Sequence, residues 1–261
     1  MRASAPGPDR TPAGTERGAR PAPWLVAVAL LVHAVAGAGS HRVEVGRFTA
    51  PVAPEALPEG WEVLTFRKVP RPTRYSVVRD GEGWVLEARS EAAASALYRP
   101  LELDLRAYPR LTWRWKIGNV LLNADARTKK GDDYPARVYV AFRYDPARAT
   151  AWERAKYGTY RLVYGTYPPR AVLNYIWDNR LPPGTTLDNA YTDRAKMIVV
   201  RSGGAEVGRW MTETRDVLDD YRRLFGDDPP PVAGVAVMTD TDDTGERAVA
   251  WYDALAFLPP E

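Results

Sequence analysis

Five acidic residues and one arginine form the part of the sequence best suited to chemistry. They are Asp132, Asp133 and Arg137 in the segment GDDYPARVYV, and Asp240, Asp242 and Asp243 in the segment DTDDTGE, with one more acid, Glu246, closing it. Carboxylates bind hard cations such as calcium, serve as acid and base in glycoside hydrolysis, and pair with arginine. The sequence leaves these three uses open for the candidate site.

The first acid pair stands before a segment that alternates like a β-strand. Its positions divide into one set of Val138, Val140 and Phe142 and a second set of Arg137 and Tyr139. Because successive side chains of a strand point to opposite faces, we expect the first set in a core and the second in a groove or on the opposite surface. The acid pair could bind calcium or cap a turn. Pairing with Arg137 is favoured, because it satisfies both charges without a ligand.

The second acidic segment has a superficial likeness to a calcium-binding loop. An EF-hand requires acids at alternating positions, a glutamate at the twelfth position and helices on both sides. Here the flanking segments are strand-like, so an EF-hand is excluded. A hairpin turn with solvated acids and a functional loop with calcium at Asp240, Asp242 and Asp243 both stay open. Like charges this close require a counterion, an arginine or a metal ion nearby.

Two further residues complete the predicted ligand site. Asn174 interrupts the apolar segment AVLNYIW and is expected to supply amide contacts, while Arg215 is expected to supply a second cation. Arg137 is expected to be structural, with Asp133 or Asp240 turned toward a ligand. Calcium is the only cofactor that these residues suggest.

Short β-type segments separated by Gly, Pro and Asp must position these side chains. They lie at 61–66, 74–78, 84–90, 95–103, 111–117, 136–142, 171–177, 196–202, 232–238 and 248–258. This spacing without alternating helices predicts a mainly β fold, an antiparallel β-sandwich of the jelly-roll or galactose-binding-like kind. One or two peripheral helices are expected: a helix over 211–226, ending at Gly226, and a short helix or loop over 147–163. Trp113 and Trp115 are expected in the core.

The N-terminal region has the pattern of a secretory signal peptide. A start with four arginines precedes an apolar run within 23–39 that is too short to span a bilayer comfortably. An uncleaved membrane anchor is the alternative. We expect a cleaved signal peptide over 1–38, a linker or edge segment over 39–57 and a single β-sandwich domain over 58–261. The mature protein would then be periplasmic or secreted, without a stable membrane span.

Composition excludes several classes of function. Removal of residues 1–38 lowers the formal net charge from +3 to +1, so no basic surface for nucleic acid is indicated. The absence of cysteine excludes thiolate nucleophiles and thiolate metal sites. With His33 and His41 as the only histidines, multi-histidine zinc sites and histidine-based triads are excluded as well.

Several motifs together resemble a known family. They are LTWRWK, GDDYPARVYV, LNYIW, YTDRAKMIVVRSG, DVLDDYRRLFG and VAVMTDTDDTGERAVAWYDALAF. Over roughly residues 58–258 the chain is similar to the bacterial family called domain of unknown function 3047. The resemblance implies an exported bacterial protein with a fold similar to galactose-binding-like or carbohydrate-module jelly rolls. It implies no particular activity.

Three functions are consistent with this sequence. The leading hypothesis is an exported, non-catalytic binding module for a saccharide or cell-envelope glycan, because aromatic, acidic and arginine side chains mix on a predicted sandwich. A nucleophile elbow, a phosphate-binding loop and a dinucleotide fingerprint are all missing from the sequence. The alternatives are a carboxylate-dependent glycan-cleaving enzyme, which needs two acids and no histidine, and a structural or partner-binding envelope protein.

Overall fold

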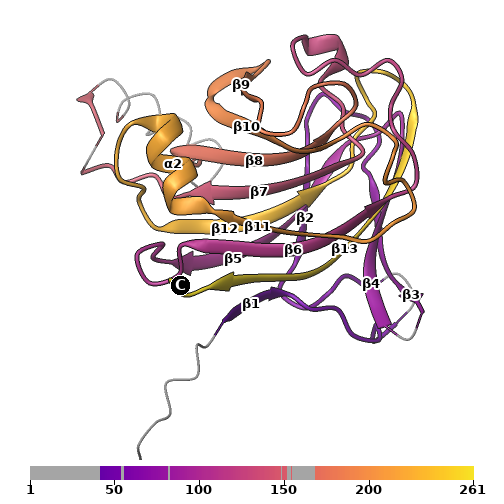
Figure 1. Cartoon of the computed structure of the whole chain (residues 1–261), viewed down its shortest axis with the longest axis horizontal. Helices are drawn as coiled ribbons and strands as arrows, with labels where there is room; N and C mark the ends of the chain where they lie inside the picture. Colours follow the sequence, from indigo (N-terminus) through magenta and orange to yellow (C-terminus); the bar gives the residue numbers. More distant parts are fainter. Residues whose placement is uncertain (1–41, 54–55, 82, 148, 152–153, 155–167) are drawn as a thin grey trace, which may run out of the picture. The chain divides into compact units, whose positions relative to one another are not determined.

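The computed structural model describes residues 42–261, apart from 54–55, 82, 148, 152–153 and 155–167. The described residues form a mainly β fold in which two sheets pack face to face (Figure 1). This arrangement confirms the predicted β-sandwich. The predicted signal peptide and most of segment 147–163 lie outside the described residues.

The first sheet contains six strands in the order β11-β6-β13-β4-β3, with β1 paired to β13. These strands are β1 (Val43–Gly46), β3 (Arg74–Asp80), β4 (Gly83–Glu91), β6 (Arg110–Ile117), β11 (Met211–Asp216) and β13 (Arg247–Leu258). The described pairs in this sheet are antiparallel. Strand β1 lies within the segment 39–57, on which the sequence predicts a linker or an edge.

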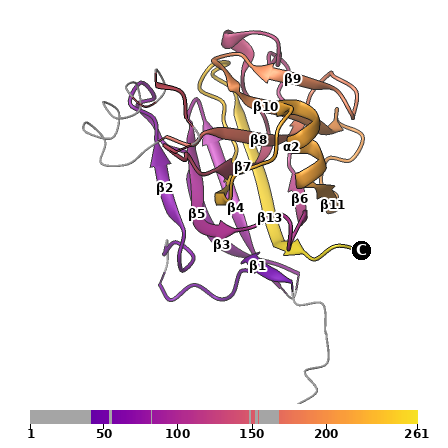
Figure 2. The same ribbon diagram turned by 90° about the vertical axis from the view of Figure 1, so that its left-hand side faces the viewer.

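The second sheet contains seven strands in the order β2-β5-β12-β7-β8-β10-β9. These strands are β2 (Glu62–Thr65), β5 (Ser95–Leu103), β7 (Ala136–Phe142), β8 (Ala171–Asp178), β9 (Thr186–Asn189), β10 (Thr192–Ser202) and β12 (Val232–Met238). Strands β8 and β10 run parallel, and the other described pairs are antiparallel. Figure 2 shows how the sheet turns from β2 at one side to β9 at the other.

Aromatic side chains from both sheets fill the space between them. On β6, Trp113 and Trp115 are fully buried. The ring of Trp113 lies 5.3 Å from that of Tyr175 on β8, and the ring of Trp115 lies 5.7 Å from that of Trp177 on the same strand. The alternation on β7 also holds, because Val138, Val140 and Phe142 are buried in this core. The predicted core positions are therefore confirmed.

The helix predicted over 211–226 is shorter than the sequence suggested. Met211–Asp216 form strand β11, which pairs with β6, and only α2 (Val217–Phe225) is helical. Asp216 begins the helix by accepting a hydrogen bond from Asp219 N at 2.8 Å, and Gly226 ends it with a positive φ of 77°. The apolar helical spacing starts only at Val217, and an edge of β6 was available to pair with the polar residues before it. No helix in the described part of the chain has the length and apolar character needed to cross a bilayer.

Helix α2 lies at one end of the sandwich, in contact with β6 and β11 of the first sheet and with β8 of the second (Figure 1). A single-turn helix, η1 (Lys129–Gly131), precedes β7. The outer face of the second sheet is left without a covering helix in the described residues. That face carries Arg137 and Tyr139, as the alternation of β7 predicts.

Candidate functional site

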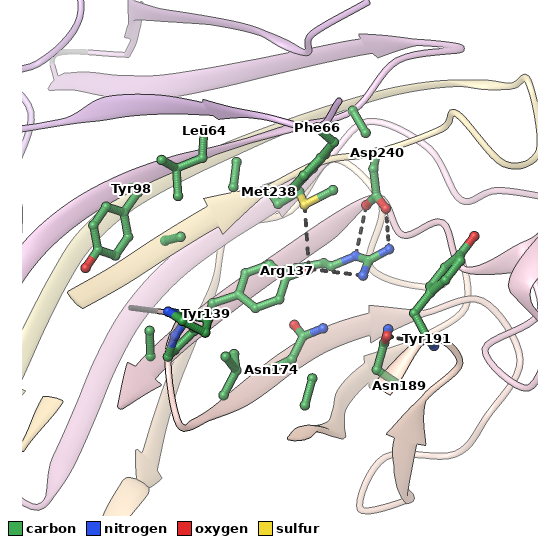
Figure 3. Close-up of a pocket in the computed structure, with 18 of the residues that line it drawn as sticks. Leu64, Phe66, Tyr98, Arg137, Tyr139, Asn174, Asn189, Tyr191, Met238 and Asp240 are labelled. Atoms are coloured by element: carbon green, nitrogen blue, oxygen red, sulfur yellow. Dashed lines mark hydrogen bonds and ion pairs between the residues drawn. The ribbon is translucent and has the colours of Figure 1, made fainter. Parts of the chain in front are cut away.

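A cavity of about 1290 Å³ lies on the outer face of the second sheet and is lined by β2, β5, β12, β7 and β8 (Figure 3). Several alanines line the cavity: Ala94, just before β5, and the strand residues Ala96, Ala141, Ala195 and Ala236. In the sheet register, Ala96 lies opposite Met238 and Ala236 lies opposite Tyr139. Because small side chains alternate with large ones across neighbouring strands, the face is hollowed.

One side of the cavity is apolar and partly exposed. Leu64 and Phe66, in and just after β2, are each 41% exposed. Tyr98 on β5 lies across β12, and its hydroxyl donates to Ala233 O at 2.6 Å. A Cβ atom at Gly234 would lie 2.3 Å from the Tyr98 ring, so any other residue at this position would displace the ring. The backbone thus holds Tyr98 as a fixed aromatic surface at the apolar end of the cavity.

The opposite side is built around a buried ion pair between Arg137 and Asp240. Arg137 Nε donates to Asp240 Oδ1 at 2.9 Å, and Nη2 contacts the second carboxylate oxygen. Nη1 donates to the Tyr139 hydroxyl at 3.0 Å, and Nη2 also donates to the backbone oxygen of Asp132. Burial opposes the charge of Arg137, but the Asp240 carboxylate raises the pKa of the guanidinium above its ordinary value. Burial raises the pKa of Asp240 well above its ordinary value, whereas the Arg137 guanidinium lowers it. We take the two groups as an ion pair because the guanidinium contacts both carboxylate oxygens.

The two neighbouring acids of the first pair have different roles. The carboxylate of Asp133 accepts from the backbone N–H groups of Asp243 at 3.3 Å and Thr244 at 2.6 Å, so it fastens the second acidic loop to the start of β7. Asp132 Oδ2 accepts from Asn189 Nδ2 at 2.9 Å. Among the described residues, Asp132 Oδ1 has no hydrogen-bond partner, although Arg137 Nη1 lies 3.8 Å away. Asp133 is structural, and Asp132 lines the cavity.

Asp242 and Asp243 stand at the acidic end of the cavity. The Tyr191 hydroxyl donates to Asp243 at 3.0 Å, and Tyr191 itself is 56% exposed. Two effects raise the pKa of Asp242 to about 6: partial burial, which is the larger, and the nearby carboxylates of Asp133 and Asp243. Partial burial also raises the pKa of Asp243, while the donated hydrogen bond from Tyr191 opposes that shift. Negative charge is thus concentrated at this end.

The acids that approach one another closely differ from the predicted calcium group. Carboxylate oxygens of Asp133, Asp242 and Asp243 all lie within 4.8 Å of one another, the arrangement in which a metal ion could be held. Asp240 does not belong to this group, because its carboxylate is turned to Arg137. Calcium at the acidic loop stays a prediction, with Asp133 in the place of Asp240.

Asn174 lies on the floor of the cavity, on β8 opposite Tyr139 of β7. It is only 1% exposed, and neither its Nδ2 nor its Oδ1 has a hydrogen-bond partner among the residues that the structure describes. Figure 3 shows its amide between Tyr139 and Asn189, on the side of the cavity where Arg137 lies. A buried amide without partners is costly, so its donor and acceptor are available to a ligand or water.

The structure brings the other predicted site residues together but not Arg215. Asp132, Arg137, Asn174, Asp240, Asp242 and Asp243 line the cavity, and Asp133 lies directly behind the acidic loop. Arg215 is instead in β11, where its Nε donates to Asp220 Oδ2 at 3.0 Å and its Nη2 to Oδ1 at 2.6 Å. The expected second cation is therefore an anchor for α2. Sequence spacing could not place it, because β11 belongs to the first sheet.

Sequence reasoning missed four residues that line the cavity: Leu64, Phe66, Tyr98 and Tyr191. Tyr98 did carry a signal, because it alternates with the buried Leu97 along β5. The other three are apolar or aromatic side chains near strand ends, and nothing in their spacing distinguishes a cavity wall from a core. Their grouping depends on the order of strands in the sheet.

Comparison with known proteins gives distant structural likenesses and one family. A mutant of the family 29 carbohydrate-binding module CBM29-2 is 10% identical, with 84% of this chain and 85% of that chain covered and a TM-score of 0.34. The Emp47p carbohydrate recognition domain is 12% identical, with 84% and 95% covered and a TM-score of 0.39. At these scores neither likeness informs function, and no curated protein matches the sequence. The family model described as protein of unknown function (DUF3047) matches residues 59–256, and the chain belongs to that family.

Proposed function

We propose that this protein binds a saccharide in the cavity on the outer face of the second sheet and does not cleave it. The observation that carries this proposal is the buried amide of Asn174, which faces the cavity with neither polar atom bonded among the described residues. A ligand that fills the cavity must therefore offer both a donor and an acceptor at the floor. Sugar hydroxyls do both.

The apolar side of the cavity supports the same class of ligand. Sugar rings present apolar C–H faces as well as hydroxyl edges, so their sites combine aromatic surfaces with a few fixed polar groups. Tyr98, which lies close to Gly234, and the exposed Phe66 supply the apolar surface. Asn174 and Asp132 supply polar atoms at the opposite side. The cavity volume of about 1290 Å³ accommodates more than one sugar ring.

The placement of the carboxylates favours binding over hydrolysis. Glycoside hydrolysis requires two carboxyl groups that flank the scissile bond from opposite sides. Asp240 is held by Arg137, and Asp133 is held by backbone N–H groups. Asp242 and Asp243 are adjacent on one loop and do not face each other across the cavity as two walls would. This arrangement supports a binding module.

The proposed location is the periplasm or the cell exterior. The support comes from the sequence, in which residues 1–38 have the pattern of a secretory signal peptide. N-terminal sequencing of protein recovered from the bacterial envelope tests the location. A chain that starts near residues 37–39 is expected, and a chain that retains Met1 would contradict export.

A glycan array followed by isothermal titration calorimetry tests the binding function. We expect at least one class of oligosaccharide to bind the purified protein, and Tyr98→Ala to weaken that binding because a fixed stacking surface is lost. The matched control is Trp84→Ala, since Trp84 is a half-buried aromatic on β4 of the first sheet. Equal affinities of the wild type and Tyr98→Ala would place the ligand elsewhere, and the absence of any glycan ligand would refute the function.

A further inference from the structure

The acidic end of the cavity has more negative charge than its cation can balance. Arg137 is the buried cation there, and its Nε and Nη2 are directed to Asp240. Asp132 lies farther from the guanidinium, with its Oδ1 3.8 Å from Nη1. Once Arg137 and Asp240 are taken as a neutral pair, the carboxylates of Asp132, Asp242 and Asp243 still face the same space.

Three neighbouring carboxylates at this end lack basic partners in the described structure. Ion pairs with Lys or Arg are formed by many acids of this protein, but none among the described residues involves Asp133, Asp242 or Asp243. Their oxygens lie within 4.8 Å of one another. Proximity of like charges is unfavourable, and it adds to the effect of partial burial in raising the pKa of Asp242. A cation that entered the cavity would relieve this repulsion.

A second, independent observation points to a ligand in the same cavity. Asn174 is almost completely buried, and both polar atoms of its amide lack partners among the described residues. The Oδ1 atom of Asp132, which is 6% exposed, also lacks a hydrogen bond there. Figure 3 places Asn174 beside Asn189, whose amide already donates to Asp132. The floor therefore offers one donor and two acceptors close to the excess negative charge.

We propose that the saccharide bound in this cavity carries a free amino group, whose ammonium lies against Asp242 and Asp243 while ring hydroxyls bond to Asn174. This inference rests on the proposed saccharide-binding function and names the class of sugar. An unsubstituted amino sugar such as glucosamine has an apolar ring face that can stack on Tyr98 and hydroxyls that can bond to the amide of Asn174. Its ammonium group supplies a positive charge at the acidic end. Uronic acids and sulfated sugars would be repelled by the same carboxylates.

A bound ammonium fits these residues better than a calcium ion. Calcium takes six to eight oxygen ligands, whereas an ammonium group needs only about three acceptors. Both carboxylate oxygens of Asp133 already accept backbone hydrogen bonds. The carboxylate oxygens left at this end are enough for an ammonium group and too few for a calcium ion. The hydroxyl of Tyr191, which donates to Asp243, fixes that carboxylate in place.

The test is calorimetry on the purified full-length protein with matched oligosaccharides. Glucosamine oligomers are compared with N-acetylglucosamine oligomers of the same length and with neutral glucose oligomers, at a pH where the amine is charged. The double variant Asp242→Asn/Asp243→Asn removes the proposed contacts. Glu59→Gln/Glu91→Gln is the control, because it removes two carboxylates from exposed positions outside the cavity lining. The control variant and the cavity double variant therefore have the same net charge. Spermine, an amine without a sugar ring, and calcium chloride serve as further probes.

We expect glucosamine oligomers to bind about tenfold or more tightly than the acetylated oligomers, a difference that the cavity double variant abolishes and the control variant keeps. Equal or tighter binding of the acetylated or neutral oligomers would overturn the amino-sugar inference and leave saccharide binding standing. Spermine that binds as tightly as the glucosamine oligomers would also overturn it. The same holds if calcium binds and the double variant abolishes that binding, while the amino group of the sugar makes no difference to saccharide affinity. If no oligosaccharide binds, the inference and the proposed function both fail.

Discussion

The guanidinium of Arg137 and the carboxylate of Asp240 form a buried two-point ion pair that joins β7 to the segment after β12. The two side chains are 3% and 2% exposed. Tyr134 lies against the pair, with its ring centre 4.0 Å from the Arg137 guanidinium carbon. The ion pair uses both carboxylate oxygens of Asp240, and this acid is not part of the close group formed by Asp133, Asp242 and Asp243.

Arg137→Ala is expected to lower the free energy of unfolding by about 3–5 kcal/mol, because it leaves the Asp240 carboxylate buried without its partner. Urea denaturation followed by tryptophan fluorescence measures the change. The control is Arg143→Ala, since Arg143 pairs with Glu102 at an exposed position and such pairs contribute about 0–1 kcal/mol. Equal effects of the two substitutions would show that the buried pair has no special structural role.

Phe142→Ala is expected to lower the free energy of unfolding by about 3–5 kcal/mol, because it opens a cavity in the core. Phe142 is fully buried, and its ring centre lies 4.6 Å from that of Tyr221 in α2. Phe66→Ala is the matched control, because Phe66 is 41% exposed on the cavity wall. Differential scanning calorimetry should show a large fall in Tm for the first variant and a small one for the second. An unchanged Tm for Phe142→Ala would contradict the assigned core.

Asn174→Leu is expected to stabilise the free protein by about 1–3 kcal/mol and to abolish saccharide binding. The substitution removes a buried amide that lacks partners among the described residues. Asn119→Leu serves as the control and should destabilise, because Asn119 Nδ2 donates to Val120 O at 3.0 Å and Arg247 O at 2.8 Å. Thermal unfolding and calorimetric titration give the two readouts. A destabilised Asn174→Leu would mean that the amide is satisfied without a ligand.

Asp242→Asn is expected to increase stability at neutral pH and to have less effect in acid. Burial and the carboxylates of Asp133 and Asp243 raise the folded-state pKa of Asp242 from 3.8 to about 6, although Arg137 opposes this shift. The folded state therefore holds this proton more tightly than the unfolded state, and stability falls as the pH rises through about 4 to 6. The asparagine variant does not undergo this loss.

Urea midpoints of the wild type and Asp242→Asn, measured at about pH 7.5 and about pH 4, test that dependence. The difference between the two proteins should be larger at the higher pH. Asp219→Asn, at an exposed position in the first turn of α2, gives the response of an acid outside the cluster. A difference that grows as the pH falls would contradict the raised pKa.

The sequence by itself determined most of the strands and the faces they present. Alternation of side chains is a local property, so the segment 136–142 predicted both its buried valines and the outward direction of Arg137 and Tyr139. The crowding of acids near Asp133 and Asp242 also predicted that the two segments belong to one polar cluster. The local pattern gave a wrong prediction for Met211–Asp216, which was expected to be helical. These residues form a strand because the edge of β6 pairs with them.

Only the tertiary structure decided which outward side chains share a cavity. Strand order is set by pairing between distant segments, and it places Tyr98, Tyr139 and Asn174 in neighbouring positions across four strands. The pairing of distant segments also places Arg215 in the first sheet, away from the cavity, and places Tyr98 next to Gly234. Whether a polar atom is satisfied depends on every neighbour in space. The unpaired amide of Asn174 could therefore not be read from its spacing along the chain.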